Sequence, residues 1–442
     1  MQPVAPTPAV AAPYAAAPYA PVAGAPSSEP MVRAEIRAGD APASRGRPPL
    51  KLGVGLRSGL AFWPNDKVKP HAGSRYANRL STPSLALHEV NVRSYLSVKL
   101  NDAFGFAASF HILHDLNDLG SLNYADPRGL IGVHPGGTGE PSAARSCFGK
   151  TTCFDLLDAV GKFGPAEYFN IWVGQFQQPT TRANLSGLYY QNQWNLPFPI
   201  GLHGFPSDFF GRDRQIVVWG TAGGGQFKYA AGALDLDGRK SKNLRWAGRL
   251  VLNLLDPEPG YGNRSTYYGE KDILSIGVAG QYQKGWRDRA TNAIHATDEL
   301  KGFAADVLFE KNLSGNGVLT LETGYYHFGS TDPGYLPNGF AGRGQSFYAA
   351  GSYLLPTKLG SGQLQPSFRY MIQDKDSLQT SSGGLGRDPK PLHTIEIGLG
   401  YIMWGHDGRA HLLYLHQQQD DRSADALVVG LQIQGFSGGG DG

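Results

Sequence analysis

The chain repeatedly alternates apolar with polar or small side chains over stretches of about ten residues. In the clearest stretch, residues 364–373, the side chains of Leu364, Phe368, Tyr370 and Ile372 share one parity, and polar residues occupy much of the other. Successive side chains of a strand point to opposite faces, so each stretch predicts a strand with one apolar face and one polar face. In a soluble sandwich the apolar faces meet inside, whereas in a transmembrane barrel they face lipid and the polar faces line a lumen.

The composition favours the barrel. Glycine accounts for 60 of 442 residues and aromatic residues for 11%. Charged residues make up 17%, below the roughly 25% of soluble domains. No stretch approaches the roughly 18 apolar residues of a membrane helix. The formal net charge of +3, without clustered Lys or Arg, gives no sign of nucleic-acid binding.

Sixteen candidate strands follow from Leu50 onward, without the alternating helices that a parallel sheet requires. We expect them at residues 50–62, 86–100, 103–114, 154–162, 166–177, 213–221, 225–235, 242–254, 271–284, 298–312, 316–329, 344–355, 361–375, 391–404, 408–419 and 424–435.

Short and long connections nearly alternate between these strands. The tight connections are Asn101-Asp102, Gly164-Pro165, Gly223–Gly225, 312–316, 356–360 and 406–407. The long connections are 63–85, 115–153, 178–212, 285–297, 330–343 and 376–390. Two connections break the rhythm, because 236–241 is short where a long loop is due and 255–270 is long where a turn is due. Short periplasmic turns and long outer loops are typical of outer-membrane barrels, so we expect an all-β transmembrane antiparallel β-barrel in the cell outer membrane.

The two ends of the chain differ from its middle. Residues 1–48 are rich in Pro and Ala, which predicts a disordered tail or spacer before a barrel at 49–436, and residues 437–442 form a Gly-rich C-terminal tail. The first residues have neither a basic region nor an unbroken apolar stretch, so they do not read as a secretory signal. Either the signal has been removed, or the start lies upstream, or the protein is not exported; we favour the first two.

Cys147 and Cys153 are the two cysteines of the chain, and they lie in a stretch that reads as loop. In an oxidising compartment they predict a small disulfide that closes this loop. Two thiols at this spacing, with no nearby His, do not make a zinc site, so we expect no metal.

The polar faces carry a set of basic side chains. Parity within each strand turns seven of them toward the lumen, namely Arg57, Arg93, Lys99, Lys228, Arg245, Arg249 and Arg369. A guanidinium binds two phosphate oxygens at once, and basic groups spaced along a pore can pass an anion along. Inward acids can instead pair with these bases and keep the lumen neutral; the candidates are Glu89, Asp306, Glu310, Glu322 and Glu396. Both interpretations stay open.

The connection 178–212 is the expected constriction, because it is long and rich in aromatic residues. Its basic groups are Arg182, Arg212 and Arg214. For Arg214, a salt bridge to Asp213 or Asp208 that anchors the loop is an equal alternative.

Three stretches resemble the phosphate-selective porin O and P family. They are Trp172–Pro179 (Trp-Val-Gly-Gln-Phe-Gln-Gln-Pro), Phe210–Val218 (Phe-Gly-Arg-Asp-Arg-Gln-Ile-Val-Val) and Phe227–Ala233. In that family a strand ends in a Gly-Gln-Phe…Pro motif, an inward-folding loop follows, and Gly-Arg-Asp-Arg opens the next strand. Residues 267–271 are also similar. The resemblance implies a sixteen-stranded barrel, commonly trimeric, that passes small anions.

Together these patterns predict an outer-membrane porin that lets small hydrophilic solutes diffuse passively, with a mild preference for anions, phosphate among them. We expect a homotrimer in membrane lipid, with no cofactor and no nucleic acid. We find no Gly-x-Ser-x-Gly elbow, no His-Glu-x-x-His and no phosphate-binding loop, so we expect no enzyme. The alternatives are a secreted or surface-attached β-sheet binding protein, and a structural barrel that anchors the envelope and has a plugged lumen.

Overall fold

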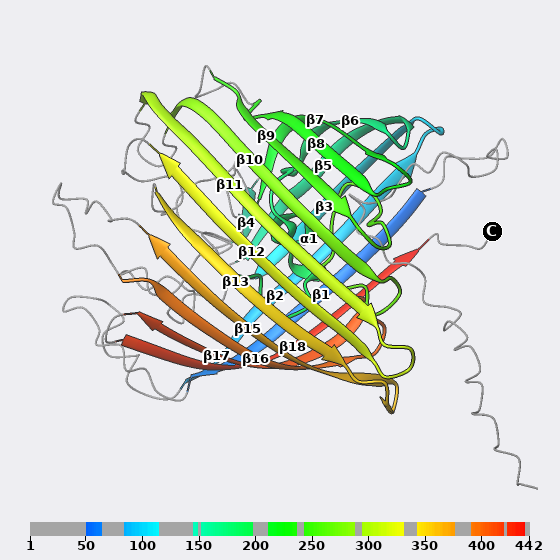
Figure 1. The fold of residues 1–442 in the computed structure, drawn as a ribbon, viewed down its shortest axis with the longest axis vertical. Helices are drawn as coiled ribbons and strands as arrows, with labels where there is room; N and C mark the ends of the chain where they lie inside the picture. Colours follow the sequence, from blue (N-terminus) through cyan, green and yellow to red (C-terminus); the bar gives the residue numbers. More distant parts are fainter. Residues whose placement is uncertain are drawn as a thin grey trace, which may run out of the picture.

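The computed structural model describes residues 50–63, 84–114, 145–148, 152–197, 211–236, 243–287, 294–330, 343–375, 390–419 and 422–437. Within these residues, eighteen strands form one antiparallel sheet that closes on itself, because β1 pairs with both β2 and β18 (Figure 1). Two of the eighteen, β4 and β14, are short arms of hairpins, which leaves sixteen long strands in the barrel wall.

The long strands are β1 (Leu50–Trp63), β2 (Ser84–Lys99), β3 (Phe104–His114), β5 (Thr152–Ala166), β6 (Phe169–Gln177), β7 (Arg212–Ala222), β8 (Phe227–Leu234), β9 (Arg245–Asn253), β10 (Ile273–Arg287), β11 (Ile294–Asn312), β12 (Val318–Ser330), β13 (Arg343–Leu354), β15 (Gly362–Lys375), β16 (Leu392–Ile402), β17 (Gly408–Gln419) and β18 (Arg422–Ser437). The shorter elements are β4 (Arg145–Phe148), β14 (Lys358–Leu359), the helix α1 (Arg182–Ser186) and the 3₁₀ turn η3 (Leu188–Tyr190).

Each of the sixteen predicted strands overlaps one long strand, so the predicted antiparallel barrel is confirmed. The Pro-rich residues 1–48 and the final residues 438–442 lie outside the described part of the chain. Most of the long connections, and the short connection 236–241, also lie largely outside it.

One predicted turn is wrong. Gly164 and Pro165 lie within β5, and the chain turns two residues later, at Glu167-Tyr168. The β5–β6 register shifts between Phe163 and Ala166, so Pro165 occupies an irregularity where a missing N–H breaks no regular ladder bond. The Gly164 N–H donates to the Ala103 carbonyl at 2.8 Å, which ties this corner to the neighbouring turn.

The outer face of the wall is apolar. Leu52, Trp246, Phe303, Phe368 and Leu431 are each 41–56% exposed, and the exposed large side chains of a strand share one parity. Soluble monomers rarely expose apolar patches larger than a few hundred Å². An apolar belt around a closed barrel is the surface that meets lipid, and closure leaves no unpaired sheet edge within the membrane. Within the described residues, no helix has the length and apolarity that crossing a membrane requires.

Two connections fold inward from opposite ends of the barrel. The inner segment, residues 178–197, follows β6 at the end where the long connections lie, and its helix α1 lies inside the barrel (Figure 1). The turn-side insert, residues 254–272, joins β9 to β10 at the end where the tight turns lie. This insert is the connection whose unexpected length broke the sequence rhythm. Most side chains of the inner segment are buried, and in the turn-side insert Glu258 and residues 261–267 are buried.

Aromatic side chains form the apolar packing inside the barrel. Trp172, Phe176, Trp219 and Tyr261 form one cluster, with ring centroids 5.0–5.9 Å apart. A second cluster surrounds Trp194 of the inner segment and includes small and aliphatic residues of β1, β17 and β18. These two clusters position the polar groups of the site.

Candidate pore constriction

The inner segment is shaped by its own hydrogen bonds. The Thr181 hydroxyl caps α1 by accepting from the Asn184 N–H at 3.1 Å. The Asn184 amide then donates to Gln178 O, Thr180 Oγ1 and Gly211 O at 3.1–3.2 Å. Because Gly211 directly precedes β7, Asn184 holds the two ends of the whole connection together.

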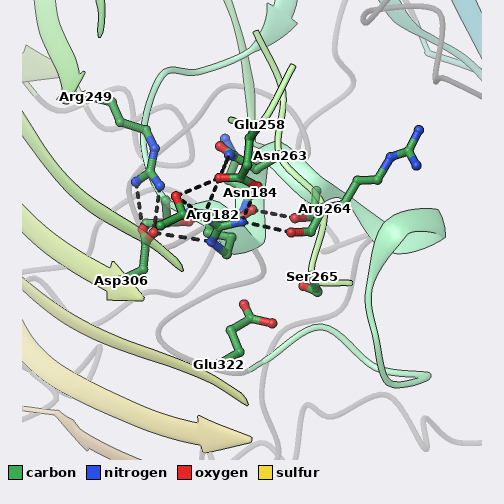
Figure 2. A network of polar contacts seen from close by, with 12 residues as sticks. Arg182, Asn184, Arg249, Glu258, Asn263, Arg264, Ser265, Asp306 and Glu322 are labelled. Atoms are coloured by element: carbon green, nitrogen blue, oxygen red, sulfur yellow. Dashed lines mark hydrogen bonds and ion pairs between the residues drawn. The ribbon is translucent and has the colours of Figure 1, made fainter. Parts of the chain in front are cut away.

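An ion pair joins the inner segment to the turn-side insert. The Arg182 guanidinium donates to both carboxylate oxygens of Glu258, with two N···O distances of 2.7 Å (Figure 2). Its remaining bonds go to Arg264 O and Ser275 Oγ, both at 2.9 Å. Both charged side chains are fully buried. The pair is bidentate and desolvated, so its hydrogen bonds are charge-assisted and strong, and loss of either partner leaves a buried charge.

Asp306 of β11 is shared by two arginines. Arg249 of β9 donates to both of its oxygens at 2.7 Å (Figure 2). The Arg182 backbone N–H donates to the same carboxylate at 3.2 Å, and the Arg182 Nε lies 3.5 Å from it. Asp306 therefore fixes the start of α1 against the barrel wall.

Glu310, also on β11, anchors the far end of the turn-side insert. Its carboxylate accepts from the Tyr267 and Gly269 backbone N–H groups at 2.8–3.0 Å, and from the Thr266 and Thr320 hydroxyls at 2.7 and 3.0 Å. Gly269 has φ 82°, a conformation that glycine adopts readily. This conformation helps the Tyr267 and Gly269 N–H groups converge on one carboxylate, while the Tyr268 N–H between them donates to Thr266 Oγ1 at 3.1 Å.

On the opposite wall, two arginines hold the backbone of the inner segment. Arg57 of β1 donates to Leu188 O at 3.2 Å and to Trp194 O at 2.6 Å. Arg409 of β17 donates to Tyr189 O at 3.3 Å and to Gln191 O. Within the described residues, no carboxylate lies within ion-pair distance of Arg409. On this wall, the guanidinium groups of Arg57 and Arg409 therefore bind backbone carbonyls of the inner segment.

The wall glycines make room for the inner segment. A Cβ on Gly430 of β18 would lie 2.5 Å from the Trp194 ring, and one on Gly55 of β1 would lie 2.9 Å from the Tyr189 ring. Part of the high glycine content thus serves close packing of aromatic rings against the wall.

The seven basic residues assigned to the lumen have varied partners. Lys228 donates to Gly262 O at 2.8 Å, so it contacts the turn-side insert. Arg245 lies 3.3 Å from the Asp213 carboxylate and donates to Gln283 Oε1 at 3.1 Å. Arg369 pairs with Glu396 and donates to Asn195 O at 2.9 Å. The structure places these three residues, with Arg57 and Arg249, in buried positions.

Arg93 and Lys99 are less enclosed. The Arg93 guanidinium lies 4.9 Å from the Tyr189 ring centroid, on the side of the inner segment that faces β2. Lys99, at the end of β2, forms a pair with Asp102 at 3.3 Å in the turn that follows. Lys99 therefore lies at the turn-side end of the barrel wall.

Of the three basic residues assigned to the constriction loop, the structure places Arg182 in the loop. Arg212 and Arg214 belong instead to strand β7, because ladder bonding with β6 begins at Arg212. Arg212 is buried and pairs with Asp158 at 2.8 Å. Arg214 is half-buried and shares parity with the exposed Ile216. Their assignment to the loop was wrong by the few residues that separate a loop end from a strand start.

The cysteines lie opposite one another in backbone register. β4 pairs antiparallel with β5, and this pairing sets Cys147 across from Cys153. The placement of their side chains lies outside the described part of the structure. Among the described residues, no three His, Cys, Asp or Glu side chains are grouped to hold a metal ion.

Sequence reasoning missed Glu258, Trp194 and Arg409. The available signal for Glu258 was the length of the connection 255–270, because a tight turn does not need so many residues. Arg409 was hidden because β17 is apolar on both parities: Leu412 faces outward, while Leu413 packs around Trp194.

The comparisons with known proteins bear on the fold. No protein-family model matches the chain, and no curated protein sequence matches it. Among solved structures, OmpF of Salmonella typhi in complex with daunomycin has a TM-score of 0.50 at 12% identity, covering 87% of this chain and 97% of that chain. An anion-selective porin from Comamonas acidovorans also has a TM-score of 0.50 at 12% identity, covering 88% and 100%.

The fold is that of the outer-membrane porins. The porin barrel and its apolar belt place the protein in the outer membrane. The outer-membrane channel DcaP of Acinetobacter baumannii has a TM-score of 0.49 at 10% identity, covering 89% of this chain and 99% of that chain. The finer resemblance to the phosphate-selective porin O and P family continues to rest on the three sequence motifs.

Proposed function

We propose that this porin barrel is an outer-membrane channel through which small hydrophilic solutes diffuse passively, with a preference for small anions such as phosphate. The observation that carries the proposal is the inner segment, which is held by polar bonds across the inside of a closed membrane barrel. A polar constriction on a rigid wall is the arrangement by which a pore selects by size and charge.

The charge of the interior supports the preference for anions. Among the residues whose burial is described, ten buried side chains are basic: Arg57, Lys162, Arg182, Arg212, Lys228, Arg245, Arg249, Arg264, Arg369 and Arg409. Seven are acidic: Asp158, Asp213, Glu258, Asp306, Glu310, Glu322 and Glu396. Most of the acids form ion pairs with these bases, so the excess of bases is small and favours a mild preference.

The test is single-channel recording in a planar bilayer, with the reversal potential measured across a KCl gradient. Conductance steps with a reversal potential toward that of chloride support an anion-preferring channel. Conductance steps without ion preference support the channel and contradict the proposed preference for anions. Folded protein that inserts and gives no steps contradicts the channel itself.

A structural barrel that anchors the envelope is the second candidate. It is favoured by one observation: inward residues of the wall and of both folded-in segments bury one another, with Arg182 and Glu258 fully enclosed. This candidate predicts inserted protein without conductance steps. The apolar outer belt counts against the soluble binding protein, which we therefore do not pursue.

We further propose a homotrimer, on the basis of the family that the motifs resemble. Light scattering of the detergent-solubilised protein gives the protein mass after subtraction of detergent. Three times the chain mass of 47.5 kDa is the expected result, and a single chain mass would contradict it.

A further inference from the structure

The inner segment and the turn-side insert meet inside the barrel along a line of contacts. Besides the Arg182–Glu258 pair, the Ser265 N–H donates to Tyr190 O at 3.0 Å, and the Ser265 hydroxyl donates to Gln191 Oε1 at 3.2 Å. The Tyr261 hydroxyl of the insert donates to the carbonyl of Gln177, the last residue of β6 before the inner segment, at 2.9 Å. The two segments therefore contact each other directly inside the barrel.

The turn-side insert is held to the wall at its edges. Lys271 Nζ donates to Pro257 O at 2.9 Å, which closes the base of the insert, and Glu310 binds residues 266–269. In the middle of the insert, the Gly262 carbonyl accepts a hydrogen bond from Lys228 Nζ of β8 at 2.8 Å. The only carboxylate of the described insert that is fully buried is Glu258, and its charge is matched mainly by Arg182 of the other segment.

Glu258 is also bonded by its own insert. Asn263 Nδ2 donates to Oε2 at 2.9 Å, the Tyr267 hydroxyl donates to Oε1 at 3.0 Å, and Ser275 Oγ donates to Oε2 at 2.7 Å. The Glu258 carboxylate therefore binds residues of the insert, Ser275 of β10 and the Arg182 guanidinium at once (Figure 2). Removal of its charge leaves Arg182 buried with Asp306 as its neighbouring carboxylate, which Arg249 already occupies.

We infer that Glu258 is a selectivity-determining residue of this pore: it latches the turn-side insert to the inner segment, and so sets both the width and the charge of the passage. The inference rests on the proposed channel function. With Glu258 in place, the insert narrows the lumen from the turn side and neutralises Arg182. Without its charge, the insert is released toward the turn end and Arg182 adds a positive charge to the passage.

The matched pair of variants is Glu258→Gln and Glu270→Gln. Both remove one carboxylate from the same insert, but the Glu270 side chain is 69% exposed and lies 3.9 Å from Arg264. Glu258→Asp is the third variant, since it keeps the charge on a shorter side chain. Each is combined with Ser265→Cys, and modification of residue 265 by the uncharged reagent N-ethylmaleimide is followed by peptide mass spectrometry.

Faster modification reports release of the insert whether or not the barrel conducts. We expect residue 265 to react at least about tenfold faster with Glu258→Gln than with the native Glu258, because a buried charge has lost its partner. Glu258→Asp should fall between, and Glu270→Gln should stay within about twofold of the native rate because exposed pairs contribute little. Equal rates for Glu258→Gln and Glu270→Gln would overturn the inference.

Single-channel recording of the same variants, without the added cysteine, separates the inference from the proposed function. Larger steps and a more chloride-like reversal potential for Glu258→Gln alone support the inference. Steps identical in all variants leave the channel standing and overturn the role of Glu258. Absence of steps from every variant overturns the proposed function and, with it, any role for Glu258 in sizing a passage.

Discussion

Arg57 is both stacked on Trp194 and hydrogen-bonded to it. The guanidinium carbon lies 3.7 Å from the indole ring centroid, and one terminal nitrogen donates to the Trp194 carbonyl at 2.6 Å. A strand residue near the start of the barrel thus fixes a residue of the inner segment through its side chain and its backbone together. Lysine lacks the planar fork that makes both contacts possible.

Replacement of Arg57 by Lys should loosen the inner segment without opening the barrel. We expect a loss of about 1–2 kcal/mol of local stability, because Lys can keep the ring contact or the carbonyl bond but not both. Hydrogen exchange of residues 188–196 should accelerate, while exchange in β1 and β18 stays unchanged. Lys51→Arg, at an exposed position of the same strand, is the control. Unchanged protection of 188–196 would show that Arg57 does not hold the segment.

Gly430→Ala should displace the Trp194 indole. The added Cβ would lie 2.5 Å from ring atoms of Trp194, so the ring has to move, at a cost of about 1–3 kcal/mol for overpacking. Near-ultraviolet circular dichroism should change, because the indole loses its fixed surroundings. Gly435→Ala, on the same strand with nothing within 4 Å of its Cβ, should leave the spectrum as it is. Similar spectra for the two variants would argue against this packing.

Neutral substitutions of Asp306 and of Arg249 change the charge of one ion pair in opposite directions. Asp306→Asn leaves two buried guanidiniums without their shared carboxylate, which should cost about 3–5 kcal/mol and shift the reversal potential toward chloride. Arg249→Gln should shift it the other way. Reversal potentials in a KCl gradient measure both, and urea denaturation in detergent measures the stability. Glu299→Gln, on the parity of the exposed Phe303, serves as the control. Shifts of the same sign would refute the assignment of these charges to the passage.

The Arg182–Glu258 pair should be insensitive to moderate acid. Burial by itself raises the pKa of Glu258, but the Arg182 guanidinium outweighs it and holds this pKa well below its ordinary value of 4.5. A depressed carboxyl pKa gives stability that is complete above the ordinary value and is lost only as the pH falls toward the folded value. Any change in unit conductance between pH 8 and pH 5 should therefore be the same with Glu258→Gln as with the native Glu258. A change in conductance across this window that Glu258→Gln abolishes would contradict the depressed pKa.

The predicted disulfide between Cys147 and Cys153 can be counted chemically. Their opposed positions in the β4–β5 ladder give a backbone arrangement that a short bridge can span. Protein unfolded in urea without reductant should show no reactive thiol, and reduced protein should show two per chain. Ellman's reagent gives the count, and two thiols before reduction would refute the bridge.

The barrel wall was predictable because its signal is local and repeated. Alternation within each strand, as in residues 364–373, fixes which side chains share a face, and strand number then follows from counting. The start of β7 illustrates the limit. Arg212 and Arg214 sit where loop and strand meet, and no local pattern says on which residue the ladder bonds begin.

The site was less predictable, because its contacts join distant residues. Arg182 could be selected as a basic residue of a long loop. Its partner Glu258 could not, since nothing within residues 255–270 says that they enter the lumen and meet a segment from the other end. In the sequence, Gly430 is only a residue of low strand propensity. The structure adds the reason for it, since the Trp194 ring packs against this position.

The pairing of β1 with β18 makes the order of synthesis matter. Gly53 of β1 lies opposite Phe436 of β18, so one edge of the first strand stays unpaired until the last strand has been made. Until then the chain exposes two open edges, which lipid cannot satisfy and which invite pairing with other chains. Assembly is thus all-or-none at its last step, and a chain shortened before β18 should be degraded or aggregate rather than form a smaller barrel.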